Sequence, residues 1–217
     1  MRKTPFINGE YYHIFNRGVD KREIFSDRED LFRFFQSMDE FNAINPIGSI
    51  YANSFVKKDK LRRPTSKCDK LVNFVAFCLN PNHYHFILEQ LVDGGISEFM
   101  KRLGGGYTKR FNDKHKRSGS LFQGRFKSVH INTNEYLLHV SAYVNLNNII
   151  HRISVSKSSF VLSSWDEYIN VNHNKKTFCE KGIILEQFSG IAKYKEFAEN
   201  SLISIREIKD MKNFLLD

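Results

Sequence analysis

AFCLNPNHYHFILE, residues 76–89, predicts two neighbouring β-strands joined by a tight turn. The apolar residues on both sides favour strands, and Asn-Pro-Asn at 80–82 is typical of a turn. Because side chains alternate along a strand, His83, His85 and Ile87 should share one face of the sheet. Two imidazoles at this spacing suit one metal ion, although a structural or surface role is the alternative.

The composition of the 217-residue chain indicates one main domain with a basic surface. The length is sufficient for one sizeable core. The formal charge of +9, the pI near 9.4 and the content of 20 Phe and 9 Tyr fit a protein that neutralises phosphates and stacks on bases. Solvated lysines without a nucleic-acid partner are the alternative explanation of this charge.

The cysteines and the hydropathy indicate a cytoplasmic location. Cys68, Cys78 and Cys179 are odd in number and lack a Cys-x-x-Cys spacing, which favours a reducing compartment. No stretch approaches the roughly 18 apolar residues of a membrane span, and the N-terminal apolar stretch is too short for a secretion signal. We therefore expect a cytoplasmic protein without a membrane partner.

The order of the predicted elements favours an α+β fold. In chain order we expect a strand at 11–15, a helix capped by Ser26 or Asp27 and ending near Asn42, strands at 50–56, 71–79 and 83–90, a helix from Gly95 to about Phe111, a strand at 129–131 and a helix over 135–148. This order predicts a ferredoxin-like sandwich with a central antiparallel sheet and helices on one face, which leaves the histidine pair on the exposed sheet face. Residues 1–150 should form this domain, and residues 151–217 a helical C-terminal extension of unknown role.

Two stretches carry charge or glycine where a phosphate contact is conceivable. The basic loop at 57–70 is as compatible with a solvated hairpin tip as with a phosphate contact. Gly104, Gly105 and Gly106 interrupt a helical pattern, but neither a G-x-G-x-x-G nor a Walker spacing is present. For these glycines we expect a kink or the close approach of another helix.

The strongest basic tract extends over residues 101–127 and contains only one acid, Asp113. Aromatic residues are interleaved with its lysines and arginines, which is typical of a nucleic-acid groove, although some of the rings must belong to the core. The basic residues are Lys101, Arg102, Lys109, Arg110, Lys114, Lys116, Arg117, Arg125 and Lys127.

Tyr143 and Asn147 lie four residues apart on the last predicted helix and should be neighbours on its surface. Together they could deliver a nucleophile and a third metal ligand to the histidine pair. A phenol with a pKa near 10 attacks a phosphate poorly unless a divalent ion polarises that phosphate. The alternative for Tyr143 is a core ring of an amphipathic helix.

Four sequence blocks together resemble the IS200-like, single-tyrosine (Y1) transposases of the HUH class, especially the REP-associated tyrosine transposase branch. The blocks are HIFNRGVDKREIF (13–25), LNPNHYHFIL (79–88), SGSLFQGRFKSVHI (118–131) and EYLLHVSAYVNLNN (135–148). They occur in the family's order and span about residues 10 to 150.

The resemblance implies a metal-dependent nickase and strand transferase that acts on single-stranded DNA and recognises hairpins. His83 and His85 match the HUH histidines, and Tyr143 matches the catalytic tyrosine, which becomes joined to a 5′ phosphate. Asn147 falls at the place of the third ligand. The implied cofactor is Mg²⁺ or Mn²⁺, and imidazole ligands favour Mn²⁺. Asn148 stands where the family's helix commonly has proline, which puts the helix geometry in doubt.

Further residues are candidates for DNA contact. Gln123, Gly124 and Arg125 match the family's Q-G-R block, to which we assign substrate contact or support of the active site. The predicted DNA-binding residues are Arg17, Lys101, Arg102, Lys109, Arg110, Gln123, Arg125 and Lys127. A homodimer and a monomer are both compatible with the sequence. A non-catalytic hairpin-binding protein and a phosphodiesterase that uses water as its nucleophile are the competing functions.

Overall fold

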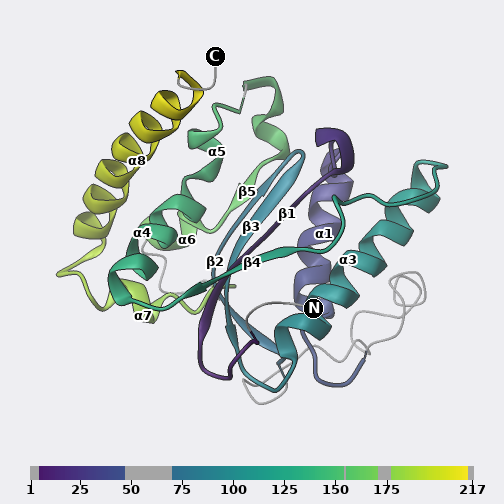
Figure 1. The fold of residues 1–217 in the computed structure, drawn as a ribbon, viewed down its shortest axis with the longest axis horizontal. Coiled ribbons are helices and arrows are strands. Elements are labelled where there is room, and N and C mark those ends of the chain that lie inside the picture. Colours follow the sequence, from purple (N-terminus) through teal and green to yellow (C-terminus); the bar gives the residue numbers. More distant parts are fainter. Residues whose placement is uncertain (1–4, 47–69, 154, 171–176, 215–217) are drawn as a thin grey trace.

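A computed structural model describes residues 5–46, 70–153, 155–170 and 177–214. Its centre is a five-stranded antiparallel sheet in the order β4-β1-β3-β2-β5 (Figure 1). The strands are β1 (Tyr11–Arg17), β2 (Val72–Asn80), β3 (His83–Gln90), β4 (Lys127–Ile131) and β5 (Leu162–Ser163). The predicted strand at 50–56 and nearly all of the basic loop at 57–70 lie outside the described residues.

Helices lie between and after the strands. They are α1 (Arg28–Glu40), α3 (Gly95–Lys114), α4 (Asn134–Asn145), α5 (Asn147–Ile150), α6 (Trp165–Ile169), α7 (Gly182–Leu185) and α8 (Ile191–Phe214), with short 3-10 helices at Val19–Lys21 and Val155–Phe160. The first four strands with α1 and α3 have the ferredoxin-like arrangement, so the predicted α+β class and antiparallel sheet are confirmed. None of the described helices has the length and apolar character that a membrane span requires.

The capping residue of α1 is Asp27, the second of the two predicted candidates. Its side chain accepts a hydrogen bond from the backbone N–H of Asp30 at 2.8 Å, which satisfies one of the donors that the first turn leaves unpaired. Leu31, Phe34 and Met38 then recur at helical spacing and are buried against the sheet. This helix and α3 cover one sheet face.

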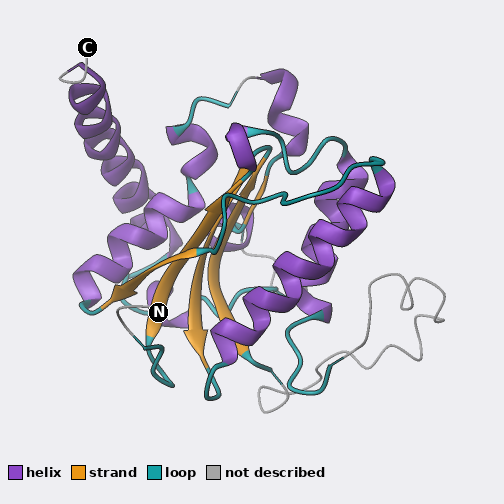
Figure 2. Cartoon of the chain, turned by 45° about the vertical axis from the view of Figure 1, so that its right-hand side comes forward, coloured by secondary structure: helices purple, strands orange, loops and turns teal. Residues whose placement is uncertain are grey.

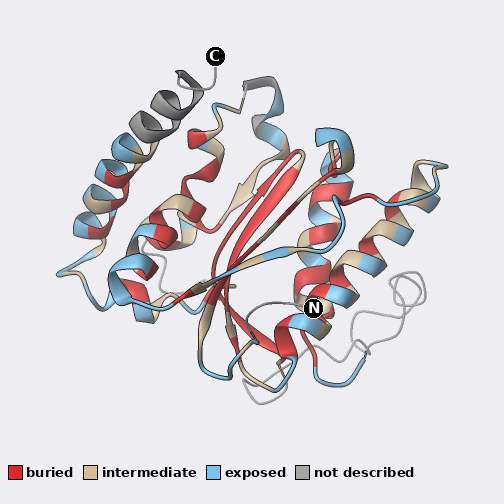
Figure 3. Cartoon of the chain, viewed as in Figure 1, coloured by how far each residue is buried: buried red, intermediate tan, exposed pale blue. Residues whose placement is uncertain are grey.

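The opposite sheet face is covered as well, which corrects the expectation of helices on one face only. Figure 2 shows α1 and α3 on one side of the sheet and α4 with the C-terminal helices on the other. The physical reason lies in β2 and β3, whose residues are buried almost throughout (Figure 3). A strand that is apolar on both faces needs a packed layer on each side.

The alternation along β3 is as predicted. Tyr84, Phe86 and Leu88 belong to the core under α1 and α3, whereas Ile87 belongs to a second core under α4. In β2 an irregularity between Phe74 and Ala76 shifts the alternation by one residue, as a β-bulge does. His83 and His85 therefore lie on the α4 side.

The described part of the C-terminal extension contributes to this second core. Tyr168, Ile184 and Tyr194 are buried there beside residues of α4. The Tyr168 hydroxyl donates to the backbone oxygen of Val75 in the bulge at 2.8 Å, and the Asn145 amide donates to the Tyr194 hydroxyl at 2.9 Å. These contacts fasten the extension to the sheet and to α4, while the division at residue 150 stays a prediction.

The helix predicted over 135–148 is divided. It ends at Asn145, Leu146 has φ −106° and ψ 16°, and a new turn, α5, begins at Asn147. The side chain of Asn145 is fully buried and bonded to the C-terminal extension through Tyr194 and Ser164. The break thus occurs beside tertiary contacts of Asn145, and the spacing of apolar residues in the sequence does not predict such contacts.

Candidate active site

A cavity of about 220 Å³ lies where the ends of β1 and β3 meet α4 and α5. It contains three histidines, a tyrosine and two basic side chains, and none of the described residues that line it is acidic. The lining residues are Phe15, Asn16, Arg17, His83, His85, Gln123, Lys127, Tyr143 and His151. Such a cavity attracts an anion such as a phosphate.

The ring of His83 is hydrogen-bonded by two asparagines, Asn80 and Asn82, that precede it in the chain. Its Nδ1 lies 2.6 Å from the Asn82 side-chain oxygen, which can only accept, so Nδ1 carries the proton. Its Nε2 lies 3.0 Å from the Asn80 amide nitrogen, which donates. The Asn147 side-chain oxygen, an acceptor, lies at the same 3.0 Å from Nε2, so this nitrogen faces one donor and one acceptor. With the proton on Nδ1, a neutral imidazole has its lone pair on Nε2, which is the form that binds a metal.

His85 is oriented by His13, a residue of β1. The two rings are joined by a hydrogen bond of 2.9 Å between His13 Nε2 and His85 Nδ1. Burial lowers the pKa of His13 to about 4, and burial followed by the neighbouring histidines lowers the pKa of His85 well below its usual range. Both rings are therefore neutral at pH 7. When Nδ1 of His85 donates to His13, its Nε2 carries the lone pair that a metal requires.

Tyr143 lies across the cavity from β3. Its ring centre is 5.4 Å from that of His85, and the two rings are perpendicular. Burial raises the pKa of the Tyr143 phenol, although the nearby Asn147 amide and the charge of Arg17 oppose this rise. The phenol is consequently protonated at neutral pH and has to lose its proton if it attacks.

Asn147, the predicted third ligand, lies behind His83. Its side-chain oxygen is 3.0 Å from His83 Nε2 and accepts from the Asn80 amide at 2.8 Å. Its amide nitrogen is buried without a hydrogen-bond partner among the described residues. The oxygen is thus close enough to His83 to share a metal ion with it, but Asn147 is fully buried and does not line the cavity.

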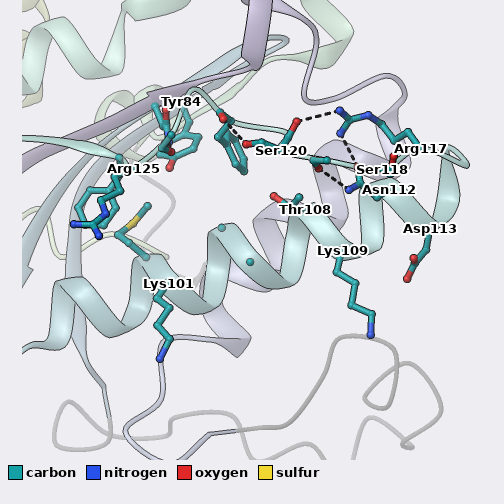
Figure 4. Close-up of a pocket in the computed structure, with 18 of the residues that line it drawn as sticks. Tyr84, Lys101, Thr108, Lys109, Asn112, Asp113, Arg117, Ser118, Ser120 and Arg125 are labelled. Carbon is teal, nitrogen blue, oxygen red and sulfur yellow. Dashed lines mark hydrogen bonds between the residues drawn. The ribbon is translucent and has the colours of Figure 1, made fainter.

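A second, larger hollow of about 1090 Å³ lies between α3 and the segment that precedes β4 (Figure 4). Four basic residues are among those that line it, Lys101, Lys109, Arg117 and Arg125, together with the rings of Tyr84, Phe122 and Phe126. Arg117 donates to the Asn112 side chain and to the Ser120 backbone oxygen, and Figure 4 shows Lys101 and Lys109 extending from α3 away from Tyr84 and Arg125. We call it the α3 groove. Asn16 lines both the groove and the cavity, so the two hollows adjoin at the end of β1.

The helix glycines belong to this groove and not to a kink. Helix α3 continues through them, and a Cβ placed on Gly104 or Gly105 would meet no atom within 4 Å. The expectation of a kink or a close helix approach is therefore wrong for these two positions. The missing side chains widen the α3 groove instead, at a cost of about 1 kcal/mol of helix stability per glycine.

The Q-G-R block separates the two hollows. Gly124 has φ +68°, a conformation that glycine adopts without strain. On either side of it, Gln123 lines the cavity and Arg125 lines the groove. This turn gives a physical reason for glycine between the two polar residues.

The predicted DNA-binding residues fall into three groups. Arg17, Gln123 and Lys127 line the cavity, and Lys101, Lys109 and Arg125 line the groove. Arg102 is bonded to Glu98 at 2.9 Å and to a backbone oxygen after α1, while Arg110 is bonded to Asp30 at 2.9 Å. These last two side chains are engaged in fastening α3 to α1 and its following loop.

The sequence analysis missed His13 and His151. His13 lies two residues from Phe15, the partner of His85 across the β1–β3 pair, and such diagonal neighbours are within reach of long side chains. His151 follows Asn147 by four residues, the spacing that already linked Tyr143 to Asn147. Applying that spacing for one further turn would have found it.

Comparison with known proteins agrees with these features. A family model described as "Transposase IS200 like" matches residues 64–147, which confirms the resemblance over the segment that holds His83, His85, Tyr143 and Asn147. No curated protein matches the chain. The fold is similar to that of a REP-associated tyrosine transposase solved with a REP hairpin, with a TM-score of 0.50, 14% identity, and coverage of 83% of this chain and 96% of that one.

Proposed function

We propose that this chain is a transposase-type enzyme that nicks and joins single-stranded DNA through a 5′-phosphotyrosine intermediate. The observation that carries the proposal is the position of Tyr143, whose ring stands perpendicular to that of His85 at 5.4 Å in a cavity with basic walls. The match of residues 64–147 to IS200-like transposases supports the same chemistry.

In the proposed reaction the Tyr143 oxygen attacks the phosphorus of a phosphodiester. A bond forms between this oxygen and the phosphorus, the bond from phosphorus to the 3′ oxygen breaks, the phenol loses its proton, and the departing 3′ oxygen takes one up. Because a phosphodiester replaces a phosphodiester, attack by a 3′ hydroxyl on the phosphotyrosine can reverse the step and join strands. Arg17 and Lys127, which line the cavity, balance the charge of the phosphate.

The donor set fits a divalent metal ion. Burial and the neighbouring histidines hold the pKa of His85 well below its usual range, so its ring is neutral, and the Asn147 side-chain oxygen lies 3.0 Å from His83 Nε2. These residues would hold Mg²⁺ or, with better affinity for imidazole, Mn²⁺. When bound, such an ion polarises the phosphate and makes it accessible to a weak nucleophile. An ion held at His83 Nε2 would take the place of the hydrogen bond from Asn80, whose amide also donates to Asn147.

The α3 groove is the proposed DNA path. Its lysines and arginines suit a phosphate backbone and its rings suit unpaired bases, and it adjoins the cavity at Asn16. The similar solved structure was determined with a REP hairpin, which makes hairpin DNA the substrate of choice for testing. We place the hairpin's single-stranded flank, and not its stem, at the cavity, because Tyr143 must reach a phosphate there.

The deciding experiment uses labelled hairpin DNA with single-stranded flanks, Mn²⁺ and denaturing electrophoresis. The wild-type protein should form a covalent adduct, and Tyr143→Phe should not, while hairpin affinity stays within about twofold because one oxygen is lost. Tyr136→Phe is the matched control, since Tyr136 lies on the same helix and is exposed outside the cavity.

The outcomes separate the competing functions. Binding without an adduct across several hairpins would favour a non-catalytic hairpin-binding protein. Cleavage without an adduct would favour a phosphodiesterase that uses water. Adduct formation by Tyr143→Phe would show that another residue is the nucleophile.

A further inference from the structure

His151 is placed by α5 at the cavity, next to the histidine pair. It follows the last residue of this helical turn, and its backbone N–H donates to the backbone oxygen of Asn147 at 3.0 Å. Its ring centre is 4.7 Å from that of His83. The end of α5 therefore brings a third imidazole to the two that β3 supplies.

The three imidazoles lie near one another, close to the separation that ligands of a single metal ion have. Ligand nitrogens of His83, His85 and His151 all lie within 4.8 Å of one another. Ligands at about 2.1 Å from an ion lie about 3 Å apart when adjacent and about 4.2 Å apart when opposite. Because the bound of 4.8 Å exceeds both values, coordination requires side-chain rotations that bring the nitrogens closer together.

His151 and Asn147 differ in their access to the cavity. His151 is half-buried and lines the cavity, whereas Asn147 is fully buried and its oxygen already accepts from Asn80. A cation in the cavity can therefore reach His151 together with His83 and His85, whereas Asn147 is not among the residues that line the cavity.

From these positions we infer that His151 is a ligand of the metal ion, so that the site contains three imidazoles and prefers Mn²⁺ to Mg²⁺. The preference follows from ligand chemistry, because imidazole suits transition-metal ions whereas Mg²⁺ demands oxygen ligands and keeps its water. The inference rests on the proposed metal site but not on the DNA chemistry.

The test measures metal binding without DNA. Mn²⁺ is titrated into the full-length protein, and free Mn²⁺ is followed by its electron paramagnetic resonance signal; Mg²⁺ affinity is obtained by competition. We expect one Mn²⁺ site in the wild type, at least about tenfold weaker binding in His151→Ala, and a smaller preference for Mn²⁺ over Mg²⁺. His151→Gln, which offers an oxygen in place of the nitrogen, should likewise lose preference for Mn²⁺ and guards against misfolding of the alanine variant.

His139→Ala is the control, because His139 is an exposed histidine of α4 that does not line the cavity. Its Mn²⁺ affinity should equal that of the wild type. If His83→Ala abolishes binding while both His151 variants bind Mn²⁺ as the wild type does, the assignment of His151 is overturned and the metal site stands. Absence of Mn²⁺ binding by the wild type would overturn both the assignment of His151 and the proposed metal site. Binding that depends on His151, together with no DNA adduct, would support the ligand and contradict the proposed enzyme.

Discussion

Among its described residues the molecule has two clusters from which a metal ion could draw three ligands, one on each side of the sheet. The histidine cluster comprises His83, His85 and His151, and the carboxylate cluster comprises Asp27, Asp30 and His115. In both, the candidate ligand atoms lie within 4.8 Å of one another. By distance alone the two are equivalent.

Charge distinguishes the two clusters. In the carboxylate cluster, Lys114 Nζ lies 2.7 Å from Asp27 and 3.0 Å from Asp30, and Arg110 lies 2.9 Å from Asp30. Protein cations thus occupy the place of a metal ion and neutralise the carboxylates. The histidine cluster contains the neutral ring of His85, and none of the described residues lining its cavity is acidic. A set of ligand atoms indicates a metal site only when cationic side chains of the protein do not already neutralise it.

The largest expected difference between substitutions in the two clusters is in DNA cleavage. His83→Ala should lower metal-dependent adduct formation by about a thousandfold, because a ligand that supports charge stabilisation at the phosphate is lost. His115→Ala should leave the rate within a fewfold, provided that it is assayed where the variant is folded. The measurement is the single-turnover rate of adduct formation in Mn²⁺. Equal losses in both variants would contradict the separation of the two clusters.

The next effect is on stability. Asp30→Ala should lower the free energy of unfolding by about 3 kcal/mol, since it leaves Arg110 and Lys114 without their buried partner. Urea denaturation followed by circular dichroism measures this change, and Asp20→Ala, at a largely exposed side chain, is the control. Mn²⁺ affinity per folded molecule should be unchanged. Loss of Mn²⁺ binding in Asp30→Ala would assign the metal ion to the carboxylate cluster and contradict the proposed histidine site.

We also predict different roles for Lys109 and Arg110, two neighbouring basic residues of α3. Lys109→Ala should lower the slope of log binding constant against log salt concentration by about 0.7, the value for one phosphate contact on a single strand. Arg110→Ala should leave that slope unchanged and reduce stability instead, because its side chain is bonded to Asp30. Fluorescence anisotropy at several salt concentrations distinguishes them. A reduced slope only in Arg110→Ala would reverse the assignment.

The smallest expected effect is on how the free energy of unfolding depends on pH in the acidic range. Partial burial alone would raise the pKa of Asp27, but hydrogen bonds from Lys114 and the Asp30 backbone outweigh it and hold this pKa below its usual range. A lowered folded-state pKa contributes stability that is present above the unfolded value of about 3.9 and is lost as the pH falls through the folded value.

Asp27→Asn isolates this charge, because asparagine keeps the helix cap. The variant should lose under about 1 kcal/mol of stability at pH 7, since the Asp27 side chain is 46% exposed and therefore screened, and the difference from the wild type should vanish at the lowest pH. Urea denaturation at several pH values measures it. A difference that persists unchanged below pH 2 would rule out the charge as its cause.

Much of the candidate site followed from local sequence rules. Strand alternation placed His83 and His85 on one face, and the i, i+4 spacing placed Asn147 near Tyr143, because both rules depend only on backbone geometry. His13 escaped prediction, since its contact with His85 depends on which strand pairs with β3 and in what register. The groove glycines were misjudged because a helix pattern does not show what lies opposite a missing side chain.

The sequence by itself determined the α+β class, the histidine pair, the tyrosine and the basic tract, because these depend on residue types at short spacing. Only the tertiary structure decided which charges are already paired, as Arg102 and Arg110 are, and which line a hollow, as Lys109 and Arg125 do. It also decided that one cluster of ligands is neutralised and the other is not. The physical reason is that burial and ion pairing depend on groups far apart in the chain, and local patterns carry no record of which of them meet.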